Sequence, residues 1–322
     1  MQRDEIYQSV TDTIIKHLES NLEGWRKPWI NVDHDDGPAR NPSQKNRPYK
    51  GINQLILSMS MMMPGKDFLK NQWMTYKQAL SMNAQVRKGE KSLPITWYST
   101  KYIDKNKKYH SAARVKSMSG AQRAEIGLQT IPMLRLYNVF NVAQIEGLDP
   151  SYYEPSEKPE LRDFEKDDRA EAVIRATGVK IEEVAGDRAY YNIERDTIRL
   201  PLRNQFQGVA DAWYNTATHE LAHATGHPSR LNRDLKNVFG SAAYAHEELV
   251  AELASAMVCA NLGFSKMTTN SAAYLKNWLG VLKDDNKAIF KAAAHAQRAA
   301  DFILDKSDFK PIAYTPQPGV EG

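Results

Sequence analysis

Hydrophobic positions along this chain recur mainly at helical spacing. In residues 3–22 the side chains of Ile6, Val10, Ile14 and Leu18 fall on one helical face, which predicts an amphipathic helix. The same spacing predicts helices at 51–63, 167–177, 209–225, 245–261, 270–283 and 285–304, with a short one after Thr75, a typical N-cap residue. Helices therefore dominate the second half of the chain.

Alternating or β-branched runs predict the strands. Residues 95–102 and 133–142 form two such runs, and the basic stretch 101–116 between them is predicted to be an exposed hairpin or loop. Two shorter strands are predicted at 189–193 and 197–200. The fold class is therefore α+β, with an α+β first module and a mainly helical second module that carries a small sheet.

Proline, serine and acidic residues gather between the two modules. This composition is typical of a linker, which we place at 149–166. The predicted domains are then 1–148 and 167–322.

Composition limits the class of protein. At 42% hydrophobic and 25% charged residues, the chain reads as a globular protein. No apolar run approaches 18 residues, so no membrane span or membrane partner is expected. The acidic N-terminus lacks the apolar segment of a secretory signal, and the single cysteine, Cys259, excludes an internal disulfide. These features predict a cytoplasmic location.

Charge is distributed unevenly. Residues 1–150 carry a formal charge of +8, whereas the remainder carries −4. A basic front half predicts a module that binds a polyanion.

Tryptophan and tyrosine alternate with cations in this basic half. Single-stranded DNA is bound by that combination, because bases stack on aromatic faces while cations contact the phosphates. The alternative is that the aromatic residues form the core and the cations only increase solubility. The candidate nucleic-acid-binding residues are Trp25, Arg26, Lys27, Trp29, Arg47, Tyr49, Lys50, Arg87, Lys88, Lys91 and Trp97.

The motif with the most specific chemistry is His219-Glu220-Leu221-Ala222-His223. On a helix, positions i and i+4 share one face, so both imidazoles can bind one cation. Glu220 is then placed to take a proton from a metal-bound water. The apolar flanks argue against a chance solvent-exposed pair, because buried histidines need a partner.

A catalytic zinc site requires a third protein ligand. Ser229 stands where a longer motif would supply a third histidine, and His227 follows a helix-ending glycine. The next helix offers Glu248 and Glu252 on one face, and we favour Glu248 as the ligand and Glu252 as the residue that orients His219 or His223. The alternative is that Glu247 and Glu248 form a solvated helix end. The expected cofactor is Zn²⁺, with Mn²⁺ or another divalent cation as alternatives.

Such a site suits peptide hydrolysis, and strand 197–200 is expected to pair with an extended substrate. No additional oxyanion donor is assigned. Tyr214 and Tyr244 are close to the motif in sequence, but most tyrosines belong to cores or interfaces.

Longer motifs show a resemblance to a family. The chain resembles the ArdC-type antirestriction proteins of conjugative plasmids. The resemblance is carried by Pro28-Trp29, Tyr49-Lys50-Gly51-Ile52-Asn53, Val86 to Lys91, Tyr137 to Leu148, Thr218 to His227, and Glu247 to Leu253. It adds Asn53 to the candidate nucleic-acid-binding residues and maps His219, Glu220, His223 and Glu248 onto the family's metallopeptidase motif.

The resemblance implies an N-terminal domain that binds single-stranded DNA, joined to a zincin-like metallopeptidase domain. It also implies protection of incoming plasmid DNA from host restriction. The protein substrate is unidentified and is expected to belong to host restriction. Two alternatives stay open: a DNA-binding shield whose protease-like domain cuts nothing, and a peptidase that cleaves a repressor.

Overall fold

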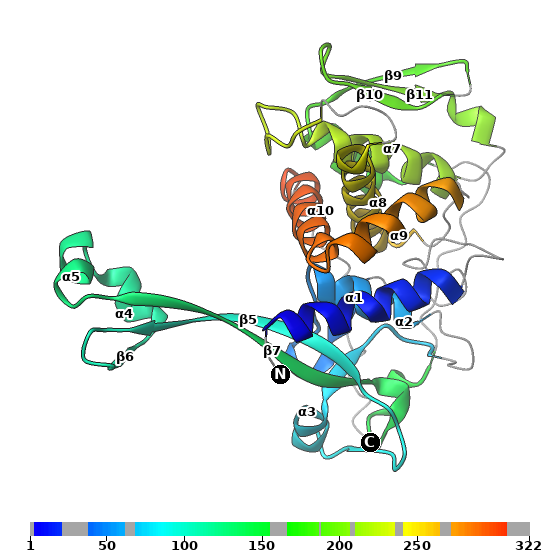
Figure 1. Ribbon diagram of the computed structural model, residues 1–322. Coiled ribbons are helices and arrows are strands. Elements are labelled where there is room, and N and C mark those ends of the chain that lie inside the picture. Colours follow the sequence, from blue (N-terminus) through cyan, green and yellow to red (C-terminus); the bar gives the residue numbers. More distant parts are fainter. Residues whose placement is uncertain are drawn as a thin grey trace.

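The computed structural model describes residues 3–20, 38–61, 68–154, 166–186, 188–206, 210–235, 241–264 and 272–307. A bundle of helices forms the middle of the molecule (Figure 1). A small three-stranded sheet lies at one end of the bundle, and a second sheet at the other end extends into a long projecting ribbon. The α+β class is confirmed.

The front helices begin and end close to the predicted positions. Helix α1 spans Arg3–Ser20, α2 spans Ile52–Ser60 and α3 spans Tyr76–Ser81. The cap predicted for α3 is present, because the Gln78 backbone N–H donates to the Thr75 hydroxyl at 3.3 Å and the Gln78 side chain accepts from the Thr75 backbone at 2.8 Å.

Four strands form the front sheet in the order β3-β7-β5-β6. The two predicted strands are β5 (Leu93–Ile103) and β7 (Gln129–Asn141), which pair antiparallel along the whole of β5. The basic stretch between them contains a hairpin to β6, as predicted, followed by two short helices that were not predicted. The remaining front elements are β1 (Arg40–Asn41), β2 (Arg47–Pro48), β3 (Trp73–Thr75), β4 (Gln85–Val86), β6 (Tyr109–His110), β8 (Ile145–Glu146), α4 (Ala112–Ser117) and α5 (Gly120–Glu125).

The second sheet has the order β10-β11-β9, built from β9 (Lys180–Val184), β10 (Tyr190–Asn192) and β11 (Thr197–Pro201). The sequence analysis missed β9, which is a largely polar edge strand. Strand β11 pairs antiparallel with β10 and parallel with β9, so both of its edges are already hydrogen-bonded. The expectation that this strand pairs with a substrate is therefore wrong.

The described segments of the back half contain five α-helices: α6 (Asp168–Ala176), α7 (Ala210–Ala224), α8 (Ala242–Leu262), α9 (Ala272–Asp284) and α10 (Ala288–Asp305). Helix α8 packs between α7 and α10. Alanines 292, 293, 296, 299 and 300 of α10 are fully buried, which lets the two helix backbones approach closely. None of the described helices has the length and hydrophobicity that a membrane span requires.

The front helices α1 and α2 belong to the same hydrophobic core as α7, α8 and α10. The Tyr7 ring meets Phe290 of α10 edge-on at 4.7 Å between centroids. The Thr11 hydroxyl donates to the backbone carbonyl of Asn286 at 2.8 Å. Residues far apart in sequence thus pack as one unit, and the boundaries at 148 and 166 remain predictions from composition.

Candidate metal centre and nucleic-acid interface

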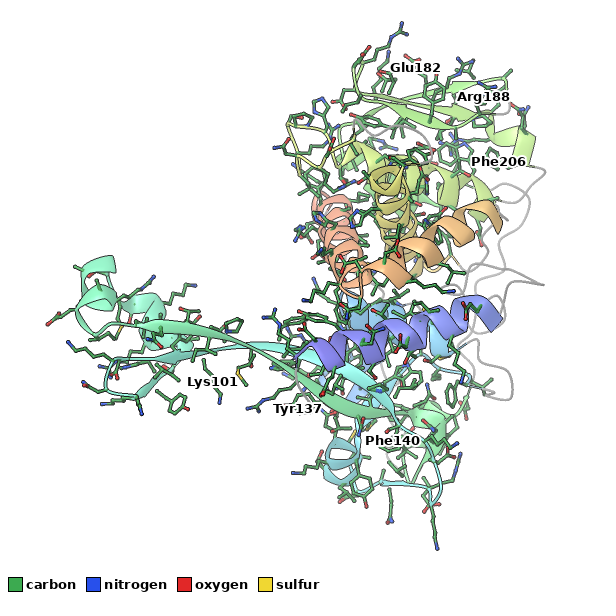
Figure 2. All side chains as sticks on the ribbon, in the orientation of Figure 1. Lys101, Tyr137, Phe140, Glu182, Arg188 and Phe206 are labelled. Carbon is green, nitrogen blue, oxygen red and sulfur yellow. The ribbon has the colours of Figure 1, made fainter. Side chains whose placement is uncertain are left out.

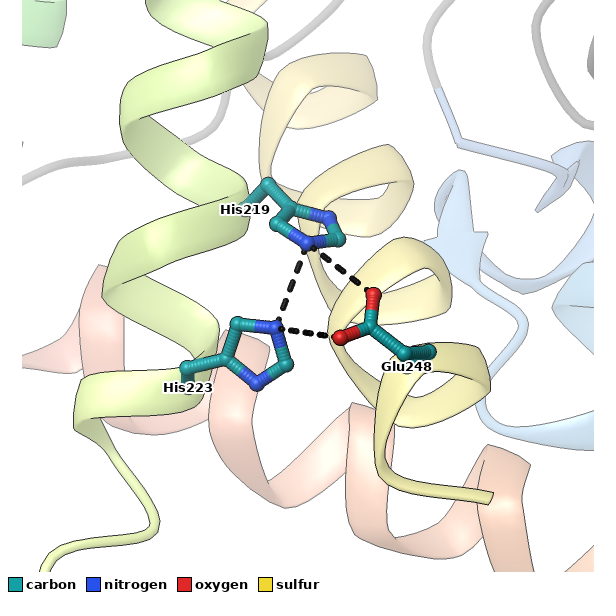
Figure 3. Close-up of side chains that lie close together, drawn as sticks. All are labelled: His219, His223 and Glu248. Atoms are coloured by element: carbon teal, nitrogen blue, oxygen red, sulfur yellow. Dashed lines mark hydrogen bonds and ion pairs between the residues drawn. The ribbon is translucent and has the colours of Figure 1, made fainter. Parts of the chain in front are cut away.

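Three side chains converge between α7 and α8 (Figure 3). The Nε2 atoms of His219 and His223, one turn apart on α7, are 3.2 Å from each other. From α8, the two carboxylate oxygens of Glu248 each lie 3.6 Å from one of these nitrogens. One ligand atom of each residue lies within 4.8 Å of the others. Two imidazole nitrogens and one carboxylate oxygen are a donor set that suits a zinc-type divalent ion with an open fourth position.

The second nitrogen of each imidazole faces another carboxylate. His219 Nδ1 lies 3.6 Å from Glu252, and His223 Nδ1 lies 3.2 Å from Glu247. Carboxylates in this position fix the orientation and tautomer of metal-binding histidines. The contact of Glu252 with His219 agrees with the position expected for Glu252. Glu247, named in the sequence analysis only in the alternative of a solvated helix end, is buried, and its contact with His223 was not predicted.

Arg233 holds Glu247 in place. Its guanidinium donates to both carboxylate oxygens of Glu247, at 2.8 and 3.0 Å, and to the backbone carbonyl of Ala222 at 2.7 Å. The chain brings Arg233 back against α7 at Gly226, where a Cβ atom would lie 2.8 Å from Leu235. A larger residue at 226 would need the Leu235 side chain to move, so this close packing favours glycine there.

The ionisable side chains at this centre shift one another's pKa values. Burial alone would lower the pKa of His219, but the carboxylates of Glu252 and Glu248 reverse this effect and raise the pKa to about 9. Burial alone would raise the pKa of Glu248, but the two imidazoles lower it to about 2. Glu248 therefore stays ionised, as a metal ligand must.

Glu220 lies next to His219 on α7 and is only 7% exposed. Behind this turn, the Thr218 hydroxyl is 2.8 Å from that of Ser255, which ties α7 to α8. His227 stays outside the cluster, since its Nδ1 contacts the Ser229 hydroxyl at 2.7 Å.

The two tyrosines near the motif have different surroundings. The Tyr214 hydroxyl donates to Glu171 at 2.8 Å and the ring is fully buried, so Tyr214 belongs to the core. The Tyr244 hydroxyl hydrogen-bonds to Glu248, which contributes to the low pKa of that carboxyl group.

A second candidate site is an open pocket of about 960 Å³ between the front sheet and α10. We call it the aromatic pocket, after the rings of Tyr49, Trp97, Tyr98, Tyr137 and Phe290 that line it. Five of the predicted nucleic-acid-binding residues reach it, namely Arg47, Tyr49, Lys50, Asn53 and Trp97. Trp97 is 55% exposed there.

Tyr49 and Asn53 also form hydrogen bonds inside the protein. The Tyr49 hydroxyl donates to the Trp73 carbonyl at 2.9 Å, and burial raises the pKa of Tyr49 to about 12. The Asn53 amide exchanges hydrogen bonds with the Thr96 backbone at 2.7 and 2.8 Å, which fixes α2 to β5. These residues shape the wall of the pocket more than they offer free polar groups.

Sequence reasoning missed the contribution of α10, which supplies Phe290, Gln297 and Arg298 to the pocket. The Gln297 side chain accepts from the Gly51 backbone at 2.8 Å, and Asp301 pairs with Lys50 at 3.0 Å. No sequence pattern links residues about 250 positions apart, so only the fold could reveal this wall.

The other predicted residues lie elsewhere. Arg87 pairs with Glu90 at 2.8 Å, and the Lys91 carbonyl accepts from Gln144 at 3.0 Å, so this turn is bonded internally. Arg87, Lys88 and Lys91 do not line the aromatic pocket. Trp25, Arg26, Lys27 and Trp29 lie outside the described residues.

The helical back half and its donor set define a zincin-like metallopeptidase domain, and residues 168–295 match the family of that description. Residues 4–140 match the N-terminal domain of the anti-restriction factor ArdC. The chain belongs to the family of ArdC antirestriction proteins.

The similar solved structures cover nearly the whole chain. The metal-free crystal structure of the antirestriction ArdC protein from the R388 plasmid is 35% identical, with a TM-score of 0.73, and the match covers 93% of this chain and 97% of that one. The Mn(II)-bound structure of the same protein has a TM-score of 0.69 at 34% identity, covering 94% and 99%.

Among curated proteins, a DNA primase TraC of Escherichia coli is 38% identical over 92% of this chain. The chain spans about a fifth of that primase (20%). A protein of Sinorhizobium fredii named y4eC is 35% identical, over 93% of this chain and 91% of the relative. The zincin-like fold implies a site for a divalent metal.

Proposed function

We propose that this protein is a metal-dependent peptidase that binds single-stranded DNA and protects incoming DNA from host restriction. The observation that carries the proposal is the convergence of His219, His223 and Glu248 beside an intact, buried Glu220. A protein that served only as a shield would have no need of a general base at that position.

His219, His223 and Glu248 are the proposed metal ligands. The divalent ion, when bound, supplies Lewis-acid polarisation of the substrate carbonyl and of water. Glu252 and Glu247 keep the two imidazoles in the orientation that ligation requires. Glu220 serves as the general base, since its position in the motif puts its carboxylate beside the first ligand.

For single-stranded DNA, the proposal rests on the aromatic pocket. Exposed aromatic faces next to Arg47, Lys50 and Arg298 match the stacking and phosphate contacts that single strands need. The protein substrate is proposed to be a protein of the host restriction machinery.

Glu220→Gln tests whether proteolysis protects DNA. The variant keeps the shape of the side chain but removes the base, so we expect hydrolysis of a labelled casein substrate to fall by a factor of 10² or more. Metal content should be unchanged, because the three ligands remain. The physiological readout is plasmid establishment in a restricting host relative to a non-restricting host, which should drop to the level without the protein.

Glu194→Gln is the matched control, because Glu194 is an exposed carboxylate in the turn between β10 and β11. It should leave both readouts at the wild-type value. If Glu220→Gln protects as well as the wild type, the peptidase model is wrong and a non-catalytic DNA shield takes its place.

A further inference from the structure

Strands β5 and β7 continue beyond the body of the protein as an isolated two-stranded ribbon (Figure 1). We call residues 97–135 the arm; β6, α4 and α5 form its tip. The base of the arm is anchored by a 3.3 Å hydrogen bond between the hydroxyls of Tyr98 and Tyr7. Beyond this anchor the buried side chains of the arm are those of Asp104, Val115 and His110, which pairs with Asp104. Because the arm contributes so little to the core, packing does not explain why it projects from the body.

The arm concentrates positive charge. It contains eight lysines and arginines and two acidic residues, a formal charge of +6 against +4 for the whole chain. The eight are Lys101, Lys105, Lys107, Lys108, Arg114, Lys116, Arg123 and Arg135, and all except Lys101 are exposed.

Within the described part of the chain, no acidic side chain neutralises these cations. Asp104 is occupied by His110, at 2.9 Å, and by backbone N–H groups of its own turn. Among the described residues, no carboxylate lies within ion-pair distance of a lysine or arginine of the arm. Lys105 instead donates to the backbone carbonyl of Glu125 at 3.1 Å. The arm therefore presents a field that attracts an anionic partner.

One face of the arm continues from the aromatic pocket. Arg135 is the cross-strand partner of Trp97, so the two side chains share a face. Lys101 lies on the same face of β5, about 13 Å farther from the pocket at the usual rise per residue. Figure 2 shows Lys101 out on the arm and Tyr137, a pocket residue, where the arm meets the body. A nucleic acid leaving the pocket would meet these cations next.

We propose that the arm binds duplex DNA and that, together with the aromatic pocket, it recognises a junction between single-stranded and double-stranded DNA. A two-stranded β-ribbon fits the major groove of B-DNA, which is about 12 Å wide. Lysines and arginines on both sides of such a ribbon would contact the phosphates along the groove. The junction preference rests on the proposed single-strand site, whereas duplex binding by the arm stands on its own.

Three fluorescent probes test the proposal on the full-length protein: a 20-nucleotide single strand, a 20-base-pair blunt duplex, and the same duplex with a 10-nucleotide single-stranded tail. The junction probe should bind at least tenfold more tightly than either of the others. Equal affinity for the junction and the plain single strand would overturn the proposal.

The variant K107N/K108Q/K116Q/R123Q removes half of the cations of the arm. Asparagine replaces Lys107 because that residue has a positive φ of 63°, which asparagine tolerates. Junction and duplex affinity should fall roughly tenfold or more, and the slope of log K against log salt should decrease by about 3 to 4. Single-strand affinity should stay within a factor of two.

The control variant K16Q/R175Q/R188Q/R195Q removes the same charge from exposed positions outside the arm. An equal loss of junction affinity in the control would mean that bulk charge, not the arm, binds the duplex. If the wild type binds no single strand but the arm variant still loses duplex affinity, the pocket proposal fails while the arm proposal holds.

A photocrosslinker at Tyr109, which is 64% exposed near the tip, gives a test that needs no loss of charge. On the junction probe, Tyr109→p-benzoylphenylalanine should crosslink to the base-paired strands. Crosslinks confined to the single-stranded tail, or none at all, would overturn the proposal.

Discussion

His219 faces Glu248 on one side of its ring and Glu252 on the other. In the metal-free protein this environment raises the pKa of His219 to about 9, so the imidazole carries a proton at neutral pH. A metal ion must displace that proton before it can bind. Metal binding at this site is therefore an exchange of ions, and its strength depends on pH.

We expect the apparent metal affinity to rise by about tenfold per pH unit between pH 7 and 9 and to level off above pH 9. A histidine with an ordinary pKa would reach its plateau near pH 6.5. Competition with a chelating dye at half-unit pH steps measures this curve with Zn²⁺ or Mn²⁺.

Glu252→Gln provides the comparison. It removes a carboxylate that raises the pKa of His219, so the plateau should begin at a lower pH. An affinity that does not change above pH 7 in the wild type would contradict this account of the charges.

For individual residues, the sequence was informative where helical spacing determines which side chains share a face. His219 with His223, and Glu248 with Glu252, are pairs at i and i+4, so their shared faces could be read directly. Glu247 could not be assigned, because its role depends on Arg233, which returns to α7 only through the turn at Gly226. Loop paths of this kind leave no periodic signal.

Helix α10 shows what one element contributes to two sites. Its alanine face packs against α8, which carries Glu248 and Glu252, while Phe290 and Arg298 line the aromatic pocket. The spacing of alanine and leucine predicted a helix at 285–304. It could not indicate what the other face meets, since that depends on how α2 and β5 are placed.

If the pocket holds single-stranded DNA, residues from both halves of the chain should contribute to its affinity. Trp97→Ala removes a stacking surface worth about 1–3 kcal/mol per base, and Arg298→Gln should reduce the salt slope by about 0.7. Fluorescence anisotropy with a single-stranded oligonucleotide over a salt series measures both effects.

Tyr190→Ala and Arg175→Gln are the controls, because both residues are exposed and lie outside the pocket. Should Arg298→Gln behave like Arg175→Gln while Trp97→Ala weakens binding, the site would be confined to the front sheet.

Strands were predicted less completely than helices. The runs that became β5 and β7 alternate clearly, but β9 has the sequence Lys-Ile-Glu-Glu-Val, whose polar residues suit a solvated edge and resemble a loop. The order β10-β11-β9 follows from a parallel pairing between β9 and β11, which no local pattern encodes. Pairing order is a property of the sheet, not of any one strand.

Over the whole molecule, the two sites are joined by a continuous core. Buried side chains of α1 and α2, including Ile14, pack in the same cluster as those of α7, α8 and α10. Ion pairs reinforce the contact at its surface, where Lys283 meets Glu19 at 2.7 Å and Lys287 meets Asp4 at 3.0 Å. Composition alone suggested two modules separated by a linker, because it reports where chain character changes and not which faces meet.

This shared core predicts that the helices of both halves unfold together. Ile14→Ala should lower the free energy of unfolding by about 2–5 kcal/mol, since Ile14 is fully surrounded, whereas Lys16→Ala on the exposed side of α1 should change it little. Metal at 100 times its dissociation constant should add about 2.7 kcal/mol to the free energy of that same transition, because the ion binds only the folded protein.

Calorimetry with and without metal distinguishes joint from independent unfolding. Two transitions, with Ile14→Ala moving one and the metal moving only the other, would mean that the halves fold independently. A single transition moved by both would mean that α1 unfolds cooperatively with the helix that carries His219, more than 200 residues away in the sequence.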